Sequence, residues 1–402
     1  MSPPAEGKDQ EKKERHTTDE LRELARSVRS GTFHYDGKPK RSLDWSSYNE
    51  AQVNEMADTL NLIRKFVDRA SARIPEKPRG RGRPPFPARD VAKALLLQTY
   101  FGVSDRVAAG LVRLFKEKLG ISEEFSYKTI ERGYDPSPAS EILREVFRLT
   151  NEHGNARETT FSVDGTGEPT SSKINYESIR AEQRRKDEKK EEDEKEPSEP
   201  SSSQRSNEPS SSSSSSSSSL PLSSAAAAET VRHGYQLSVM SVGVHTKLYA
   251  GFATTGDRSV GEFSFFPSLV SQTRINCPAM ERMLGDSLYA NRVACAIVAR
   301  DGAMPYFLPK SNSKFLSLGV PSWNNMTHAL VEDPQRWLEA YHDRSISETA
   351  NSMDKSEFPE RIRRRIPHRK DAVSALRRYV HNIRRYGYME HLQPELLKPL
   401  RS

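Results

Sequence analysis

The sequence predicts an α/β protein with one mixed sheet, a helical region before the sheet and a disordered insert within it. From residue 158 onward, short segments with strand and helix patterns follow one another, which is typical of α/β folds. Residues 89–150 instead carry only amphipathic helical patterns. The insert, about residues 178–229, is first highly charged and then almost pure serine, so it cannot bury enough apolar surface to fold.

Helices are predicted before the sheet. Segments 19–30 and 48–73 have apolar residues at helical spacing. Prolines and glycines exclude regular structure from the basic arm that follows them. In the helical region Ser104 is a predicted N-cap, and Gly120 is predicted to end the same helix. Short helices beside a basic arm fit a helix-turn-helix-like DNA reader and, equally well, a plain helical bundle.

The sheet region has a predicted order of strand, insert, strand, strand, helix, strand, helix, strand and then helices. The two strands after the insert are expected to form a hairpin with its turn between Gly243 and Lys247. The chain therefore divides into an N-terminal arm with helices (1–78), a basic arm with a helical DNA-binding domain (79–155) and a sheet domain (156–402). The predicted strands of the sheet domain are 158–164, 235–244, 248–254, 283–286 and 304–309. The predicted helices between them are 261–272 and 291–300, and the insert is about 178–229.

The net charge of +7 favours a polyanionic partner, although many soluble proteins are mildly basic. Two basic runs, 361–365 and 377–385, lie in the final third, which is predicted to be helical. Cys277 and Cys295 match no metal-binding spacing and are expected to be buried thiols. The apolar runs are too short to span a bilayer and the N-terminus has no apolar targeting segment, so we expect a cytoplasmic protein without membrane contact.

Three acidic residues are the candidate catalytic residues. Asp164 ends the first predicted strand and is followed by small residues, and Asp286 ends a later strand. Glu348 lies on a predicted helix. Ligand sites of α/β sheets lie at the carboxyl ends of strands, and carboxylates gathered there bind Mg²⁺. Taken singly, each residue has a commoner explanation, because an Asp-Gly is usually a turn and a helical Glu is usually solvated.

The neighbourhood of Glu348 strengthens this hypothesis. Tyr341, Arg344, Glu348 and Lys355 are spaced so that they share one stripe of a regular helix, and Arg344 can pair with Glu348 one turn away. Arg344 and Lys355 could then hold phosphates, and Tyr341 could contact DNA. Without further information, an exposed face with salt bridges is the commoner explanation of such a stripe.

The spacing Tyr341-x2-Arg344-x3-Glu348-x6-Lys355 resembles the Y-(2)-R-(3)-E-(6)-K signature of prokaryotic insertion-sequence DDE transposases. The segments around Asp164 and Asp286 resemble the first and second acidic motifs of that family. Residues 82–97 and 125–130 resemble its N-terminal region, so the resemblance covers about residues 80–385 without the insert.

The resemblance implies a ribonuclease H-like catalytic domain with a mixed sheet flanked by helices. It also implies that Asp164, Asp286 and Glu348 bind two Mg²⁺ ions, with Mn²⁺ as a substitute, for cleavage at inverted-repeat ends and strand transfer into target DNA. Two such ions, about 4 Å apart, can hold the attacking and leaving oxygens of a phosphodiester. The implied partner is double-stranded DNA, bound by a dimer in the nucleoid.

The insert departs from the family pattern because it follows Asp164 closely in the sequence. Two other classes therefore stay open: a catalytically inactive DNA-binding derivative of a transposase, and a ribonuclease H-like nuclease without strand transfer.

Two further segments are candidate DNA contacts. Arg81 and Arg83 lie in a stretch that resembles an AT-hook, whose arginines enter narrow A·T minor grooves, although an interdomain linker explains it equally well. Lys128 and Arg132, on the third short helix of the helical region, are candidate contacts to phosphates or bases.

Overall fold

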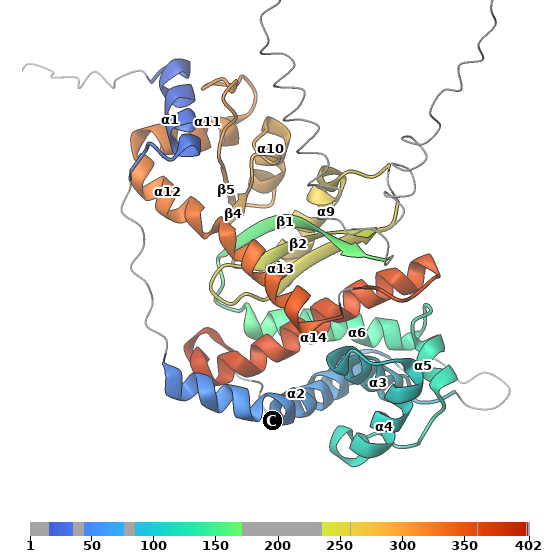
Figure 1. Cartoon of the computed structure of the whole chain (residues 1–402). Helices are drawn as coiled ribbons and strands as arrows, with labels where there is room; N and C mark the ends of the chain where they lie inside the picture. Colours follow the sequence, from blue (N-terminus) through green and yellow to red (C-terminus); the bar gives the residue numbers. More distant parts are fainter. Residues whose placement is uncertain are drawn as a thin grey trace, which may run out of the picture.

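The computed structural model describes residues 16–34, 44–75, 85–170 and 235–400, except residues 258, 360 and 399 (Figure 1). The predicted disordered insert lies outside the described residues, as do Arg81 and Arg83 of the basic arm.

The centre of the molecule is a five-stranded mixed sheet with the strand order β3-β2-β1-β4-β5. The antiparallel pairs are β1–β2 and β2–β3, and the parallel pairs are β1–β4 and β4–β5. This confirms the predicted mixed α/β sheet and the hairpin after the insert, whose turn lies between Gly243 and Tyr249. The strands are β1 (Thr160–Pro169), β2 (Tyr235–Gly243), β3 (Tyr249–Thr255), β4 (Arg282–Gly285) and β5 (Met304–Phe307).

Strand β1 is longer than the sequence predicts. Asp164 was expected to end it, but β1 continues to Pro169 because β2 pairs with it position by position. Asp164 therefore lies in the middle of the strand, opposite Met240. The last pair joins Pro169 to Tyr235, so the chain leaves and re-enters the sheet at neighbouring positions.

The pairing of Pro169 with Tyr235 gives a first prediction. Replacing residues 172–233 by a turn of about four residues should keep the fold and raise the free energy of unfolding by about 2 kcal/mol. The reason is that each halving of a flexible loop recovers about 0.6 kcal/mol of closure entropy. Urea unfolding measures the difference. An equally long Gly-Ser segment is the control and should match wild type, whereas loss of folding in the shortened chain would contradict the prediction.

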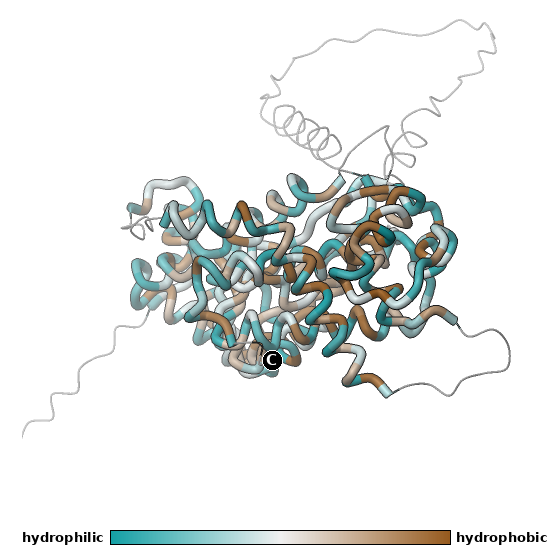
Figure 2. Tube along the Cα trace, turned by 90° about the horizontal axis from the view of Figure 1, so that it is seen from below, coloured by the Kyte–Doolittle hydropathy of each residue, from teal (hydrophilic) through white to brown (hydrophobic). Residues whose placement is uncertain are grey.

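Helices cover both faces of the sheet (Figure 1). Helices α9 (Phe266–Asn276) and α10 (Arg292–Arg300) lie on one face, where Phe161 and Val163 belong to their core. Helices α13 (Ile346–Glu357) and α14 (Pro367–Leu392) lie on the other face. Apolar and polar residues follow one another in short groups along most helices, as expected of helices with one buried side (Figure 2).

The predicted helical region forms beneath α14, and its helices share a core with that helix and with α2 (Trp45–Arg73). Ser104 precedes α4 as its N-cap residue without a side-chain capping hydrogen bond, and Gly120 ends α4 with φ of 61°. Whether these helices read DNA stays a prediction, as does the division into three regions. The helices of the region are α3 (Ala88–Phe101), α4 (Asp105–Leu119), α5 (Tyr127–Gly133) and α6 (Pro138–Gly154).

The first helix, α1 (Thr18–Ser30), docks beside α11 (Pro321–Glu332) at the β5 side of the sheet. Leu21 is fully buried in the same core as Phe161, and the Arg29 guanidinium donates to the Pro309 carbonyl at 2.6 Å. The N-terminal region thus contributes helices to opposite sides of the molecule, since α2 packs on α14.

Several smaller predictions can be checked directly. Cys277 and Cys295 are buried free thiols, as predicted, and burial raises the pKa of Cys295 to about 12. No helix in the described part of the chain is long and apolar enough to cross a membrane.

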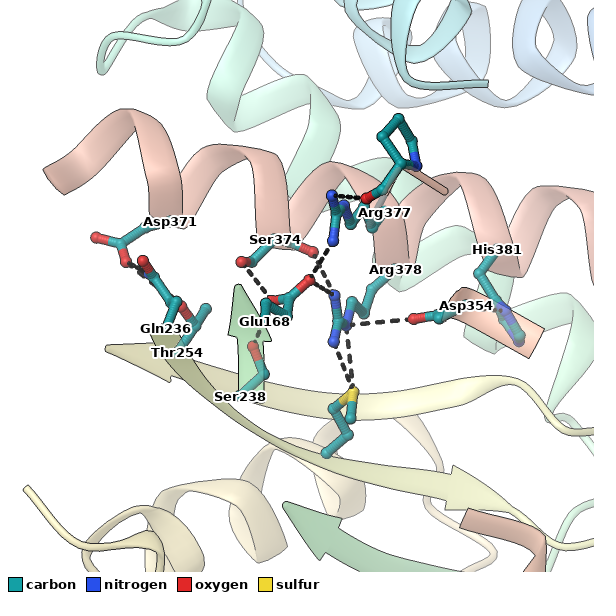
Figure 3. Close-up of polar contacts among 12 residues, drawn as sticks. Glu168, Gln236, Ser238, Thr254, Asp354, Asp371, Ser374, Arg377, Arg378 and His381 are labelled. Atoms are coloured by element: carbon teal, nitrogen blue, oxygen red, sulfur yellow. Dashed lines mark hydrogen bonds and ion pairs between the residues drawn. The ribbon is translucent and has the colours of Figure 1, made fainter. Parts of the chain in front are cut away.

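A buried group of ion pairs fixes α14 to the sheet (Figure 3). We call it the Glu168 clamp. Glu168, near the end of β1, accepts hydrogen bonds from Arg377 at 2.9 Å, Arg378 at 2.8 Å and Ser374 at 2.6 Å. Burial alone would raise the pKa of Glu168, but the two guanidinium groups outweigh it and lower that pKa to about 2. The carboxylate is therefore charged, and it holds the second half of β1 against α14.

Candidate active site

The strand register brings the two predicted aspartates together. Parallel pairing of β1 with β4 ends at Val163 and Gly285, and the next residue on each strand is Asp164 and Asp286. Neighbouring strands lie about 4.8 Å apart, and residues paired in register point to the same face. Asp286 follows the end of β4 as predicted, and its Oδ1 accepts the Leu288 amide at 2.8 Å.

Helix α13 brings Glu348 to the same face of the sheet. Ser162, two residues before Asp164, donates to the carbonyl of Arg344 at 2.9 Å and to the hydroxyl of Ser347 at 3.2 Å. Alternate residues of a strand share a face, so these bonds place the start of α13 over the face that carries Asp164. Glu348 is on the first turn of this helix, and its side chain is 60% exposed.

Asp286 and Glu348 both act electrostatically on Asp164, although the three carboxylates are not all within 4.8 Å of one another. Burial raises the pKa of Asp164 most, and the carboxylates of Glu262, Asp286 and Glu348 raise it further, to about 6. A hydrogen bond from the Gly165 backbone acts in the opposite direction. The site therefore concentrates negative charge.

Glu262, at the start of the 3-10 helix η1 (Glu262–Phe265), is the carboxylate that sequence reasoning missed. Its Oε1 accepts the hydroxyl of Tyr289 at 2.6 Å. A Cβ atom on Gly165 would lie 2.5 Å from the Glu262 carboxyl group, so a larger residue there would require that carboxyl group to move. The small residues after Asp164 did indicate a close approach, but the approaching group lies about a hundred residues later in the chain.

Asn351 is a second residue that the sequence did not single out. It lies one turn after Glu348, and its Nδ2 donates to Asp164 Oδ2 at 3.3 Å. Its Oδ1 is buried and has no hydrogen-bond partner among the described residues. An unpartnered amide oxygen beside carboxylates is a donor set that hard divalent cations prefer, so the residues present fit Mg²⁺ or Mn²⁺.

The predicted stripe from Tyr341 to Lys355 is not one regular helix. Tyr341 lies in the last turn of α12 (Pro334–His342), Arg344 lies in the 3-10 turn η2 (Asp343–Ser345), and Glu348 and Lys355 lie on α13. A 3-10 turn has three residues per turn and an α-helix has 3.6, so residues before and after the turn no longer follow the spacing of one regular helix. The predicted pair of Arg344 with Glu348 does form, at 3.4 Å.

The other predicted DNA contacts differ in exposure. Tyr341 is partly buried and stacks on Trp337 with ring centroids 5.1 Å apart, and Arg344 lies 6.0 Å from the Tyr341 ring. Lys355 is exposed on α13, and Lys128 and Arg132 are exposed on α5. Binding by any of them stays a prediction.

A separate buried cluster consists of Asp354, Glu357 and His381. In the part of the chain that the structure describes, it is the group of three whose ligand atoms all lie within 4.8 Å of one another. Arg384 contacts Glu357 at 2.8 Å, and Arg378 lies 3.7 Å from Asp354. Burial would lower the pKa of His381, but Asp354, 2.8 Å away, outweighs burial and raises it. Because these cations already balance the carboxylates, we interpret the cluster as an ion-pair network that joins α13 to α14.

Fold and geometry together define a mixed α/β protein with an acidic site where β4 ends beside β1. This chain is similar to a protein from Archaeoglobus fulgidus described as "Probable transposase for insertion sequence element ISA1214". The two are 24% identical over 269 residues, which cover 67% of this chain and 65% of the relative, just under two thirds of its length. No family model matches the chain, and no solved structure matches it.

Proposed function

We propose that this protein is a DNA transposase of the DDE type with a ribonuclease H-like catalytic domain. The observation that supports the proposal is the parallel pairing of β1 with β4, which ends immediately before Asp164 and Asp286, together with the hydrogen bond from Ser162 to the start of α13. The similarity to an insertion-sequence transposase supports the same class. The proposed reaction is cleavage at inverted-repeat ends, followed by strand transfer into target DNA.

The roles of the residues follow from their positions. Asp164, Asp286 and Glu348 would hold two Mg²⁺ ions, which supply charge neutralisation at the attacking and leaving oxygens of a phosphodiester. Asn351 orients Asp164 through its hydrogen bond, and Tyr289 fixes Glu262. Such a reaction depends on positioning and charge neutralisation more than on covalent chemistry, so a rigid arrangement of carboxylates suits it.

DNA is the proposed partner, and synapsis of two element ends would require a dimer. Arg344 and Lys355 lie before and after Glu348 along the chain, where they can meet the phosphates of a bound strand. The unbroken β1–β2 register on either side of the insert supports an intact catalytic domain over an inactive derivative.

Cleavage of a labelled duplex that carries the element's own ends tests the proposal. We expect Mg²⁺-dependent cuts at the ends with wild type, loss of cuts in EDTA, and loss of cuts with Glu348→Gln. Joining of the freed 3′-hydroxyl to a target plasmid separates a transposase from a nuclease. Tight binding without cutting in Mg²⁺ or Mn²⁺ would reject the proposal in favour of an inactive DNA-binding derivative.

A further inference from the structure

The two basic runs of the final third, 361–365 and 377–385, differ in how their arginines are paired. In the run 377–385, Arg377 and Arg378 bind Glu168, and Arg384 binds Glu55 and Glu357. These guanidinium groups lie inside the protein, where they neutralise carboxylates. Internal ion pairs thus neutralise these arginines of the run 377–385, which leaves little of their charge for a binding partner.

The run 361–365 is built differently. The sequence predicted a helix here, but residues 361–366 form a non-helical connection between α13 and α14. The Ile362 amide donates to the Pro169 carbonyl at 2.9 Å, next to the end of β1, and its side chain is fully buried. Arg364 donates to Asp105 at 2.8 Å, and its guanidinium lies 3.9 Å from the centroid of the Tyr134 ring. Ile362 and Arg364 therefore anchor the connection to the protein.

Three further arginines alternate with these two anchors along the connection. Arg363 and Arg365 are exposed, and Arg361 is half-buried. None of the three makes a hydrogen bond or an ion pair with another residue that the structure describes. We call Arg361, Arg363 and Arg365 the basic strap.

The charge of the strap suits a row of phosphates. Arg361, Arg363 and Arg365 carry three guanidinium groups within five residues. Duplex DNA carries one negative charge per roughly 1.7 Å of helix axis, so several phosphates lie within reach of such a group of cations. Arginine binds phosphate through two parallel hydrogen bonds, which makes it well suited to such contacts.

The strap also continues a surface that carries other predicted DNA contacts. Just after the strap, Arg369 donates to Glu131 at 2.9 Å and to Asp135 at 2.7 Å. These bonds tie the start of α14 to α5, whose Lys128 and Arg132 are exposed. The start of α14, which follows the strap directly, therefore lies beside the helix that carries these two cations.

We propose that the basic strap binds the phosphate backbone of duplex DNA independently of base sequence, as a positioning surface for the acidic site. The inference rests on the proposed function for its partner, but it concerns residues outside the acidic site. Its anchor at Pro169 is five residues from Asp164 on β1, so DNA held by the strap is held close to that strand.

Salt-dependent binding tests the strap. The probe is a fluorescent duplex without element ends, measured in EDTA so that no cleavage occurs. In the full chain, the triple change Arg361→Gln, Arg363→Gln and Arg365→Gln should lower the slope of log K against log salt by about 2.7, since each phosphate contact contributes about 0.9. Affinity at 100 mM salt should fall at least about tenfold.

Two controls make the result specific. The triple change Arg292→Gln, Lys310→Gln and Lys314→Gln removes the same charge from exposed positions elsewhere and should leave the slope unchanged. Replacing the three strap arginines by lysine should restore most of the slope, because the charge is kept. An unchanged slope in the glutamine triple, with wild type binding and cutting DNA normally, would overturn the strap alone. Failure of wild type to bind any duplex would overturn both the strap and the proposed function.

Discussion

Replacing Asp164 by asparagine is expected to abolish cleavage while it stabilises the metal-free protein. Cleavage should fall at least about a thousandfold, because the substitution removes a proposed ligand of Mg²⁺, and charge stabilisation by such an ion is worth several kcal/mol. Binding of end-carrying duplex in EDTA should stay within about twofold of wild type. A variant that cuts at the wild-type rate would remove Asp164 from the proposed site.

The stability half of this prediction follows from the raised pKa of Asp164. A carboxyl whose pKa rises from 3.8 to about 6 on folding destabilises the charged state by up to about 3 kcal/mol. Because the folded pKa is raised, the contribution of Asp164 to wild-type stability is most favourable below pH 4 and declines as the pH rises from 4 to 6. Asparagine cannot ionise, so the variant should lack this decline.

Urea unfolding in EDTA between pH 4 and pH 7.5 measures the difference between the two proteins. The variant should be the more stable protein at pH 7 and equal to wild type near pH 4. Added Mg²⁺ should raise the unfolding midpoint of wild type more than that of the variant. Parallel pH profiles for the two proteins would show that the carboxylates do not repel one another.

The second large effect concerns the Glu168 clamp. Glu168→Gln should lower the free energy of unfolding by about 3–5 kcal/mol, because it leaves two buried guanidinium groups without their shared carboxylate. Domains are typically stable by only 5–15 kcal/mol, so the variant should lie close to unfolding at 37 °C. Urea unfolding at neutral pH, with cleavage as a second measurement, gives the result.

A matched control is available for this substitution. Glu131 also binds an arginine, Arg369 at 2.9 Å, but its side chain is 43% exposed. Glu131→Gln should therefore cost less than about 1 kcal/mol, as exposed pairs do. Equal effects of the two substitutions would mean that burial does not strengthen the Glu168 clamp.

Local signals in the sequence were enough for the order of strands and helices. The hairpin after the insert, the end of β4 before Asp286 and the glycine that ends α4 each depend on periodicity or turn chemistry within a few residues. Asp164 and Asp286 were expected to gather where strands end. Although β1 continues past Asp164, its parallel pairing with β4 ends immediately before these two residues.

Features that depend on distant residues were not predictable in this way. Nothing near Asp164 indicates that β1 continues to Pro169, since that follows from pairing with β2 beyond the insert. Glu262 looks like any exposed helix-start carboxylate until the fold brings it over Gly165. The break in the stripe at Arg344 is a backbone adjustment that residue spacing alone does not reveal.

The long sequence separation within the Glu168 clamp affects how the chain folds as it is synthesised. Glu168 and Arg378 are 210 residues apart. At about 5–20 residues per second, the ribosome takes about 10–40 s to make the second after the first. During that interval β1 exists, but the guanidinium group that allows its carboxylate to be buried does not. A nascent chain that stops before α14 would already contain Asp164, Asp286 and Glu348. It would lack the two arginines that allow Glu168, on the same strand as Asp164, to be buried. Burial of the Glu168 carboxylate therefore follows synthesis of α14, after all three acidic residues of the proposed site have been made.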